Sequence, residues 1–544
     1  MNTPLLEVDH LSVDFQTVDG LFHAVKDISF SIEKGETLAI IGESGSGKSV
    51  TASAILGLLD MPPAIMRSGD IHFRGKSLLK MPRAERRAAA GRDISVVFQD
   101  PLVHLNPVFP VGWQIAEVCR IHGSSRTEAD RLAIELLGRV GISNPEKRQR
   151  QYPHEFSGGQ RQRIMIAMSM AMKPALLIAD EPTTALDVTV QAQILDLLRD
   201  IQRETGTSIL MITHDLGVAA DVADRVLVMR RGEMVETGAI RDVLLNPRQQ
   251  YTRDLIAAGE MAPGPPRSPA EKILEVSNVS LQYGDVKVVH DMSLTLHKGE
   301  IMCIVGESGS GKSTLARSIL RLMSPSSGEI KFHGADITQL DKDGIRRYQR
   351  AVQAVFQDPY SSLNPRMKVM DIIAEPWTIQ KDVLPRQHWR ERAGALLESV
   401  GLDVKALDKF PGEFSGGQRQ RIAIARALAM SSEIIVCDEA VSALDLTVQA
   451  QVITLLRDLR DRLNVALLFI CHDLNLVRSF ADSVLVMQGG KVVEQGAAAT
   501  LFDEPKHFYT QRLIAASPVA DPVAQSDRRH ARQALDRVDN AAGL

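Results

Sequence analysis

Cysteine is scarce in this sequence of 544 residues, and the four cysteines are widely separated. They are Cys119, Cys303, Cys437 and Cys471, and no two of them form a C-x-x-C pair. This spacing supports neither a disulfide framework nor a zinc site. We therefore expect reduced thiols, most of them buried as small hydrophobic side chains.

Long apolar runs and an excess of one charge are also missing. The longest uncharged apolar stretch, Ile164 to Met172, is far shorter than the roughly 20 residues that span a bilayer. Residues Met1 to Asp9 lack the pattern of a secretory signal, which favours a cytoplasmic location. Lys plus Arg is 63 and Asp plus Glu is 67, a net charge of −4 that argues against general electrostatic binding to nucleic acid.

The composition is otherwise that of an ordinary soluble globular protein. Hydrophobic residues make up 44% and charged residues 24% of the chain, which excludes a disordered or collagen-like protein. At about 100 to 200 residues per domain, the length predicts three or four domains or subdomains.

The two halves of the chain repeat each other. The sequence GESGSGKS spans residues 42–49 and recurs at residues 306–313. Later landmarks keep an offset of 258 residues, as from Gln99 to Gln357. Such a repeat predicts two copies of one folding unit.

A proline-rich segment separates the halves. Residues Met261 to Pro269 read MAPGPPRSP, which is typical of an extended spacer. The last residues are polar and show no strong apolar periodicity. We therefore expect one domain at 1–259, a linker at 260–272, a second domain at 273–518 and a weakly ordered tail at 519–544.

Each half carries a phosphate-binding pattern in the right context. An apolar run, Thr37 to Ile41 or Ile301 to Val305, leads into the glycine-rich loop, and a helical segment follows. The pattern G-x-x-x-x-G-K-[ST] needs this strand, loop and helix, because backbone N–H groups surround the phosphates at the helix N-terminus. Two copies at repeat spacing make a chance match negligible.

The lysines of these loops would reach the β- and γ-phosphates, and the serines that follow them would hold Mg²⁺. The candidate nucleotide-binding residues are Gly42, Glu43, Ser44, Gly45, Ser46, Gly47, Lys48, Ser49 and Val50, with Gly306, Glu307, Ser308, Gly309, Ser310, Gly311, Lys312, Ser313 and Thr314.

A pair of acids follows a continuous apolar run in each half. The runs read LLIADE and IIVCDE, as expected for strands buried on both faces of a parallel sheet. Carboxylates at the end of such a strand lie beside the nucleotide crevice. We assign Asp180 and Asp438 to Mg²⁺ binding, and Glu181 and Glu439 to the general base.

A third motif narrows the family. FSGGQRQR spans Phe156 to Arg163 and recurs from Phe414 to Arg421, just before apolar helical segments. It resembles the signature motif of ATP-binding cassette (ABC) proteins, and a Ser-Gly-Gly turn that opens a helix is itself an anion site. The resemblance implies that this motif binds the γ-phosphate held by the opposite cassette. The residues are Ser157, Gly158, Gly159 and Gln160, with Ser415, Gly416, Gly417 and Gln418.

Other segments resemble further elements of that family. Gln99 and Gln357 look like the glutamine of the Q-loop, which touches the metal and signals to a membrane partner. ALD at residues 185–187 and 443–445 looks like the D-loop. His214 and His472 look like the switch histidine. Phe15 and Tyr283 look like the aromatic residue that stacks on adenine, and packing in the core is the alternative for Phe15.

The resemblance implies an α/β fold with two tandem ABC-type P-loop ATPase domains. Each has a mostly parallel sheet, an antiparallel β part and a helical subdomain. We call residues 1–259 the first cassette and residues 273–518 the second cassette.

Family cassettes pair head to tail, which implies two composite ATP sites, both able to hydrolyse ATP with Mg²⁺. The first composite site would join Lys48, Glu181 and His214 to Ser415 and Gly417. The second would join Lys312, Glu439 and His472 to Ser157 and Gly159.

The surroundings of the motifs resemble one branch of the family. Each Q-loop glutamine is followed by Asp-Pro and then Leu-Asn-Pro, and QYTR at 250–253 is answered by FYTQ at 508–511. These features are similar to importers of peptides, opines and nickel. Two ATPases fused in one chain are similar to the microcin C-type oligopeptide importer, with the glutathione type second. Because neither Tyr-Thr element is followed by cysteine, the iron–sulfur cluster of some relatives is not expected.

The importer resemblance implies an ATP-hydrolysing subunit on the cytoplasmic face of the inner membrane. Two membrane-embedded permease subunits would contact the Q-loop grooves, and a solute-binding protein outside the membrane would deliver the solute. Nucleic acid is not an expected partner. Two alternatives stay open: a soluble tandem ABC protein acting on ribosomes, which normally carries a long charged arm between cassettes, and the ATPase of an exporter.

Overall fold

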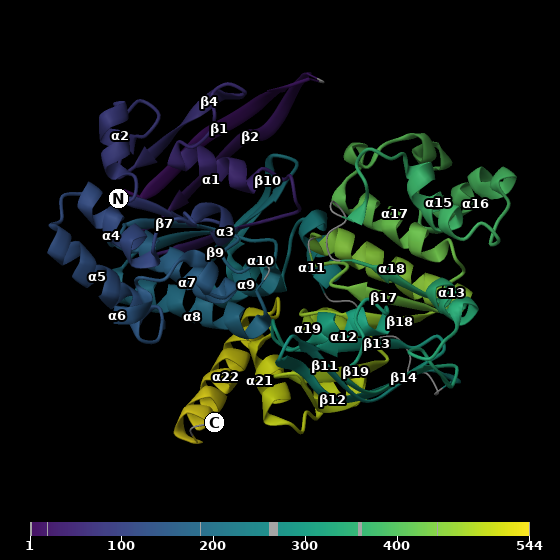
Figure 1. Cartoon of the computed structure of the whole chain (residues 1–544). Helices are drawn as coiled ribbons and strands as arrows, with labels where there is room; N and C mark the ends of the chain where they lie inside the picture. Colours follow the sequence, from purple (N-terminus) through teal and green to yellow (C-terminus); the bar gives the residue numbers. More distant parts are fainter. Residues whose placement is uncertain are drawn as a thin grey trace. The chain divides into compact units, whose positions relative to one another are not determined.

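The computed structural model describes residues 3–18, 20–184, 186–259, 270–356, 362–442 and 444–542. The chain forms two compact units. The first unit comprises Met1–Ala257 together with Pro518–Ala534, and the second comprises Ala258–Ser517 with Leu535–Leu544. Figure 1 draws the first cassette in purple to teal and the end of the chain in yellow.

An antiparallel sheet forms one layer of the first unit. Its strand order is β2-β1-β4-β5, so that β1 pairs with both β2 and β4. Apolar side chains from β1 and β2 are buried in one core, where they meet the parallel sheet. The strands are β1 (Leu6–Thr17), β2 (Gly20–Ile32), β4 (Ala64–Phe73) and β5 (Lys76–Ser77).

The second sheet of the first unit has the order β10-β9-β3-β8-β7-β6. All neighbours are parallel except β9 and β10. Every residue of β3 and β8 is buried, as their uninterrupted apolar sequences predict for central strands. The bounds are β3 (Thr37–Ile41), β6 (Ile94–Val97), β7 (Leu176–Asp180), β8 (Ser208–Ile212), β9 (Arg225–Arg230) and β10 (Glu233–Ala239).

Helices α4 to α7 contribute to a separate helical part of the first unit. Its apolar core includes Ile115, Leu137 and Ile164, from α4, α5 and α7. A reciprocal capping box of Ser125 and Glu128 starts α5. Together with the short α3 (Pro101–His104) before them, the helices are α4 (Val111–Ile121), α5 (Arg126–Arg139), α6 (Pro145–Arg148) and α7 (Gly158–Ser169).

The remaining helices of the first cassette connect the strands. The long helix α8 is capped at its N-terminus by Asp187, whose side chain accepts a hydrogen bond from the Val190 N–H. The helices are α1 (Lys48–Leu56), α2 (Arg83–Ala89), α8 (Val188–Thr205), α9 (Leu216–Val222), α10 (Ile240–Leu245) and α11 (Gln250–Gly259).

The second unit repeats both sheets. Its antiparallel sheet has the order β12-β11-β14-β15, and its mixed sheet the order β16-β17-β18-β13-β19-β20. The strands are β11 (Lys272–Tyr283), β12 (Val286–His297), β13 (Ile301–Val305), β14 (Ser327–Phe332), β15 (Ala335–Asp336), β16 (Val352–Val355), β17 (Ile434–Asp438), β18 (Ala466–Ile470), β19 (Ser483–Gln488) and β20 (Lys491–Ala497). The expected α/β class is confirmed in both units.

The helices of the second unit follow the same plan. Trp377 of α15 is fully buried, and its Nε1 donates a hydrogen bond to the Ala429 carbonyl oxygen. The helices are α12 (Lys312–Ile319), α13 (Lys342–Ala351), α15 (Val369–Ile379), α16 (Trp389–Ser399), α17 (Gly416–Leu428), α18 (Leu446–Leu463), α19 (Leu474–Phe480), α20 (Ala498–Asp503) and α21 (Phe508–Ala516).

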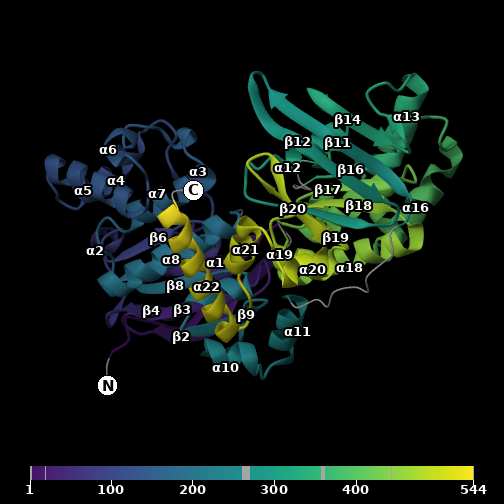
Figure 2. The ribbon, with the colours of Figure 1, turned by 90° about the horizontal axis from the view of Figure 1, so that it is seen from below.

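The end of the chain differs from expectation. Residues Pro522–Ala542 form helix α22, and the segment Pro518–Ala534 belongs to the first unit. Figure 2 shows α22 alongside α8. The expectation of a weakly ordered tail at 519–544 was wrong. Apart from Pro522 at its start, the buried residues of α22 are the polar Gln525 and Arg532, which leave no apolar periodicity.

Two further expectations concern the linker and the cysteines. Residues 260–269 of the expected linker lie outside the described residues, and β11 begins at Lys272. All four cysteines are buried free thiols, as expected. In the part of the chain that the structure describes, no helix is long and apolar enough to cross a membrane.

We predict that Leu137→Ala destabilises the helical part of the first unit. The Leu137 side chain is fully buried, so its truncation should cost about 2–5 kcal/mol. Ile121→Ala on α4 is the control, because Ile121 is 73% exposed and its loss should change stability by less than about 0.5 kcal/mol. Hydrogen exchange of α4 and α5 would measure both, and equal exchange in the two variants would contradict the assignment of this core.

Candidate active sites

The glycine-rich loop of the first cassette runs between β3 and α1. Gly42 has a φ of 150°, and a Cβ there would lie 2.2 Å from the carbonyl oxygen of Met229 on β9. Gly47 has a φ of 101°, and its Cβ would lie 2.6 Å from the Ala24 carbonyl oxygen. Neither position admits a side chain, so both glycines are needed to bring the loop against the sheet.

The second loop has the same geometry. Gly306 has a φ of 148°, and a Cβ there would lie 2.1 Å from the carbonyl oxygen of Met487 on β19. Gly311, with a φ of 98°, precedes α12. The repeat therefore extends from the sequence to the backbone conformation of both loops.

Each loop lysine is buried and bound to its own loop. The Nζ of Lys48 donates to the carbonyl oxygens of Gly42 at 2.7 Å and Glu43 at 2.9 Å. Lys312 Nζ donates to those of Gly306 and Glu307 at 2.8 and 2.7 Å. A buried ammonium group inside a loop at a helix N-terminus forms an anion site.

A serine and an aspartate meet behind each loop. Ser49 Oγ donates to Asp180 Oδ1 at 3.2 Å, and Ser313 Oγ donates to Asp438 Oδ1 at 3.0 Å. Burial, reinforced by the neighbouring glutamate, raises the pKa of both aspartates. The hydroxyl and carboxylate oxygens are hard donors of the kind that Mg²⁺ prefers, so the residues present fit this ion.

Three side chains contact Glu181, which directly follows β7. Gln99 Nε2 donates to Glu181 Oε2 at 2.8 Å, and Thr184 Oγ1 donates to the same oxygen at 3.0 Å. His214 Nδ1 lies 3.1 Å from Glu181 Oε1. Gln99 follows β6 and His214 follows β8, so the ends of three neighbouring parallel strands converge here.

The electrostatics of this cluster favour an ionised pair. Burial alone would raise the pKa of Glu181, but its hydrogen bond to His214 and the charge of that ring bring the pKa below its usual value. Burial likewise opposes the charged form of His214, yet Glu181 raises its pKa. The carboxylate is therefore ionised near neutral pH and can accept a hydrogen bond from water.

The corresponding pair of the second cassette is more open. His472 Nδ1 lies 3.9 Å from Glu439 Oε1. The expected Q-loop residue Gln357 lies outside the described residues. Glu181 and Glu439 share the left-handed backbone conformation, with φ of 48° and 50°, which is strained for a residue with a side chain.

The signature motifs open helices α7 and α17. Ser157 and Gln160 form a reciprocal capping box, and Ser415 and Gln418 form the equivalent one. The second glycine of each motif packs against the next long helix. At Gly159 a Cβ would lie 2.4 Å from Val190 Cγ1, and at Gly417 it would lie 2.1 Å from Val448 Cγ1.

The two aromatic candidates for adenine stacking are in different surroundings. Phe15 is partly buried and packs against the core of the first unit. Tyr283 is 47% exposed, and its hydroxyl accepts a hydrogen bond from Arg317 at 3.2 Å. Their contact with adenine stays a prediction, as does the pairing of the cassettes into composite sites.

Two tyrosines reach the loops, and sequence reasoning did not assign them to the sites. The hydroxyl of Tyr251 on α11 accepts a hydrogen bond from the Glu43 N–H at 3.4 Å. The hydroxyl of Tyr509 on α21 accepts a hydrogen bond from the Glu307 N–H at 3.0 Å. Both belong to the repeated Tyr-Thr element, so the available signal was their constant offset from the other motifs.

Comparisons with known proteins identify the family of the chain. Residues 25–184 and 289–442, together more than half of the chain, match the family model described as "ABC transporter". Residues 493–543 match "Oligopeptide/dipeptide transporter, C-terminal region". Among solved structures, cbiO1 of the cbiONQ complex from Clostridium perfringens aligns with a TM-score of 0.40 and 28% identity, covering 45% of this chain and 95% of that one.

Curated relatives match over nearly their whole length. The "Peptidoglycan transport ATP-binding protein YejF" of Agrobacterium fabrum is 47% identical, over 94% of this chain and 96% of the relative. The "Glutathione import ATP-binding protein GsiA" of Pectobacterium atrosepticum is 42% identical, over 98% of this chain and 92% of the relative. The chain therefore belongs to the ATP-binding proteins of ABC transporters, in the peptide importer branch, and carries two fused cassettes.

Proposed function

We propose that this chain hydrolyses ATP at two sites to energise the import of short peptides or peptide-containing solutes. One observation carries the proposal: each cassette places a buried lysine, a serine–aspartate pair and a glutamate–histidine pair at the same edge of its sheet. These are the groups that phosphoryl transfer to water requires, and neither cassette lacks one of them.

The residues have separate roles in this proposal. Lys48 and Lys312 bind the phosphates, and the loop N–H groups surround them. Glu181 and Glu439 orient the attacking water and accept its proton. Magnesium, when bound, neutralises the charge that develops on the phosphates. The residues that would hold it are Ser49, Asp180 and Gln99, with Ser313, Asp438 and Gln357.

The histidines would sense the γ-phosphate. His214 and His472 each follow a buried central strand, which places them beside the loop at the end of that strand. In the composite sites, the signature residues of one cassette would complete the site built on the loop of the other. Closure would then depend on ATP, and hydrolysis would reverse it.

The proposed partners follow from the family. We infer two membrane-embedded permease subunits that receive the Q-loop faces, and a solute-binding protein that delivers the solute, at the cytoplasmic face of an inner membrane. The match to an oligopeptide transporter region favours this function over the ribosome-acting and exporter alternatives. The relatives' names, peptidoglycan transport and glutathione import, both point to solutes that contain peptide bonds.

Uptake by cells tests the solute class and the direction of transport. Cells with the chain intact should accumulate labelled glutathione or a labelled muropeptide, and cells with the Glu181→Gln/Glu439→Gln variant should not. If the variant cells instead retain more of an internally supplied label, the chain serves an exporter. If neither peptide depends on the chain, the peptide assignment is wrong.

We predict that Glu181→Gln and Glu439→Gln each lower kcat for ATP hydrolysis by about 100-fold or more, because the amide cannot accept the proton. ATP binding should persist. Glu7→Gln makes the same change at an exposed position on β1 and should leave turnover unaltered. Near-normal turnover in either single variant would refute two equivalent catalytic sites.

We also predict that Tyr251→Phe and Tyr509→Phe weaken ATP binding. Each removes one hydrogen bond to a loop N–H, worth about 1 kcal/mol, so Kd should rise about fivefold. Tyr348→Phe is the control, because its hydroxyl bonds the Ile319 carbonyl oxygen instead. Titration with a fluorescent ATP analogue measures all three, and an unchanged Kd in the first two would exclude a role for these tyrosines.

A further inference from the structure

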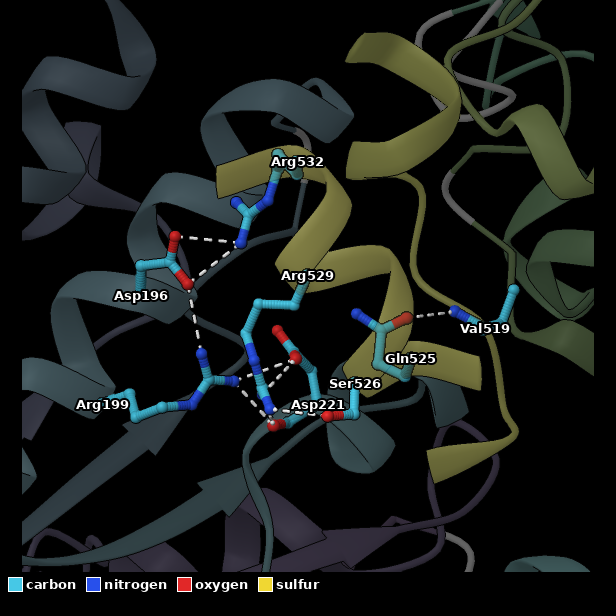
Figure 3. Close-up of polar contacts among 8 residues, drawn as sticks. All are labelled: Asp196, Arg199, Asp221, Val519, Gln525, Ser526, Arg529 and Arg532. Carbon is cyan, nitrogen blue, oxygen red and sulfur yellow. Dashed lines mark hydrogen bonds and ion pairs between the residues drawn. The ribbon is translucent and has the colours of Figure 1, made fainter. Parts of the chain in front are cut away.

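The C-terminal segment is bound to the first unit by a buried network of charges (Figure 3). Arg532 donates a hydrogen bond to Oδ1 of Asp196 on α8 at 3.0 Å, and the same nitrogen forms an ion pair with Oδ2 at 2.9 Å. Arg529 donates to the Asp221 carboxylate on α9 at 3.0 Å and to its backbone carbonyl oxygen at 3.2 Å. Arg199 of α8 contacts both acids. We call these five residues the tail network.

The network is buried at its centre and partly open at its edge, where the Asp196 side chain is 27% and that of Arg529 is 19% exposed. Arg532 is 5% exposed, and the Asp221 side chain is 2% exposed. Without the tail, Asp196 and Asp221 would share Arg199, which would leave a net negative charge. The tail supplies two further guanidinium groups at a spacing of three residues, which places both on one face of a helix. Removing one partner of such a buried pair is strongly unfavourable.

The segment before α22 packs just as closely. At Gly217, in the first turn of α9, a Cβ would lie 2.7 Å from the Pro518 carbonyl carbon and 2.8 Å from the Val519 nitrogen. Val519 N–H in turn donates to Gln525 Oε1 at 2.9 Å. Only glycine therefore lets the tail lie against the start of α9, two residues after Asp215 and three after His214.

The second cassette lacks the features that accommodate the tail. At the repeat offset of 258 residues, as from Gln99 to Gln357, only Arg199 has an identical counterpart, which is Arg457 of α18. Where the first cassette has Asp196, Gly217 and Asp221, the second has Thr454, Asn475 and Ser479. Thr454 is exposed and bonds to its own helix, at the Ala450 carbonyl oxygen. Arg457 still donates to the Ser479 carbonyl oxygen, as Arg199 does to that of Asp221.

We propose that residues Pro518–Ala534 form a clamp that restrains α9, the helix following the first switch histidine, and has no counterpart on the second cassette. The acids of the tail network and Gly217 are the receptor for this clamp. Its consequence for His214 rests on the role proposed above for that histidine. The clamp holds His214 at 3.1 Å from Glu181, whereas the unclamped His472 lies 3.9 Å from Glu439.

Two variants release the clamp from opposite sides. Gly217→Asn gives α9 the residue that α19 already carries at this position. The new side chain prevents the tail from packing against α9, and the sequence of the tail is unchanged. Arg529→Glu/Arg532→Glu removes the cations and leaves the cassette intact. The matched controls are Asn475→Gly, the reverse swap in the second cassette, and Arg537→Glu, which changes an exposed arginine of α22.

Hydrogen exchange on the full-length chain tests the clamp directly. In both release variants, residues 522–534 and α9 should exchange about tenfold faster or more, because a helix that loses its packing opens locally. Helix α19 and both controls should match the unaltered chain. A tail already unprotected in the unaltered chain, or an α9 that does not respond in either release variant, would overturn the proposal.

ATP turnover tests the effect on His214 separately. The release variants should lower kcat about tenfold with little change in ATP affinity, because a displaced catalytic group costs rate rather than binding. Faster exchange of α9 with unaltered turnover would refute the coupling to His214. If the control variants lose turnover as well, the effect is not specific to the clamp, and the clamp's assignment to the first cassette is wrong.

Discussion

The close approach of each glycine-rich loop to the sheet is the constraint on which both sites depend. At Gly42 and Gly306 the backbone lies against a carbonyl oxygen of β9 or β19, where any Cβ would overlap it. This contact holds the loop at the edge where β3, β7 and β8, or their counterparts, end. A side chain at either glycine would move the lysine and the serine away from the acids that follow the neighbouring strand.

The sequence predicted the parts of the sites that local patterns encode. The loops, the apolar strands and the acids behind them have strict spacing, and the structure brings Ser49 to Asp180 as that spacing implies. The hydrogen bond of Gln99 to Glu181 joins residues that follow two separate strands, so no local pattern specifies it. Tyr251 belongs to the Tyr-Thr element that marks the family branch in the sequence, but its contact with Glu43 requires the folded path of α11.

The tail shows why apolar periodicity fails for some helices. Gln525, Arg529 and Arg532 repeat at helical spacing. The two arginines bind Asp221 and Asp196 of the first cassette, and Gln525 accepts a hydrogen bond from the Val519 N–H of its own segment. A pattern search that scores hydrophobic side chains ranks such a face as solvent-exposed. The pattern becomes visible only when the two halves are compared, since Asp196 and Asp221 have no acidic counterparts at the repeat offset.

The burial of the cysteines has a practical consequence for labelling. Burial raises the pKa of all four thiols, that of Cys437 to about 12, so each is protonated and shielded from solvent in the folded chain. Alkylating dyes react with thiolates. A single cysteine introduced on the surface would therefore react selectively in the folded protein, and optical probes could be attached without first replacing the native residues.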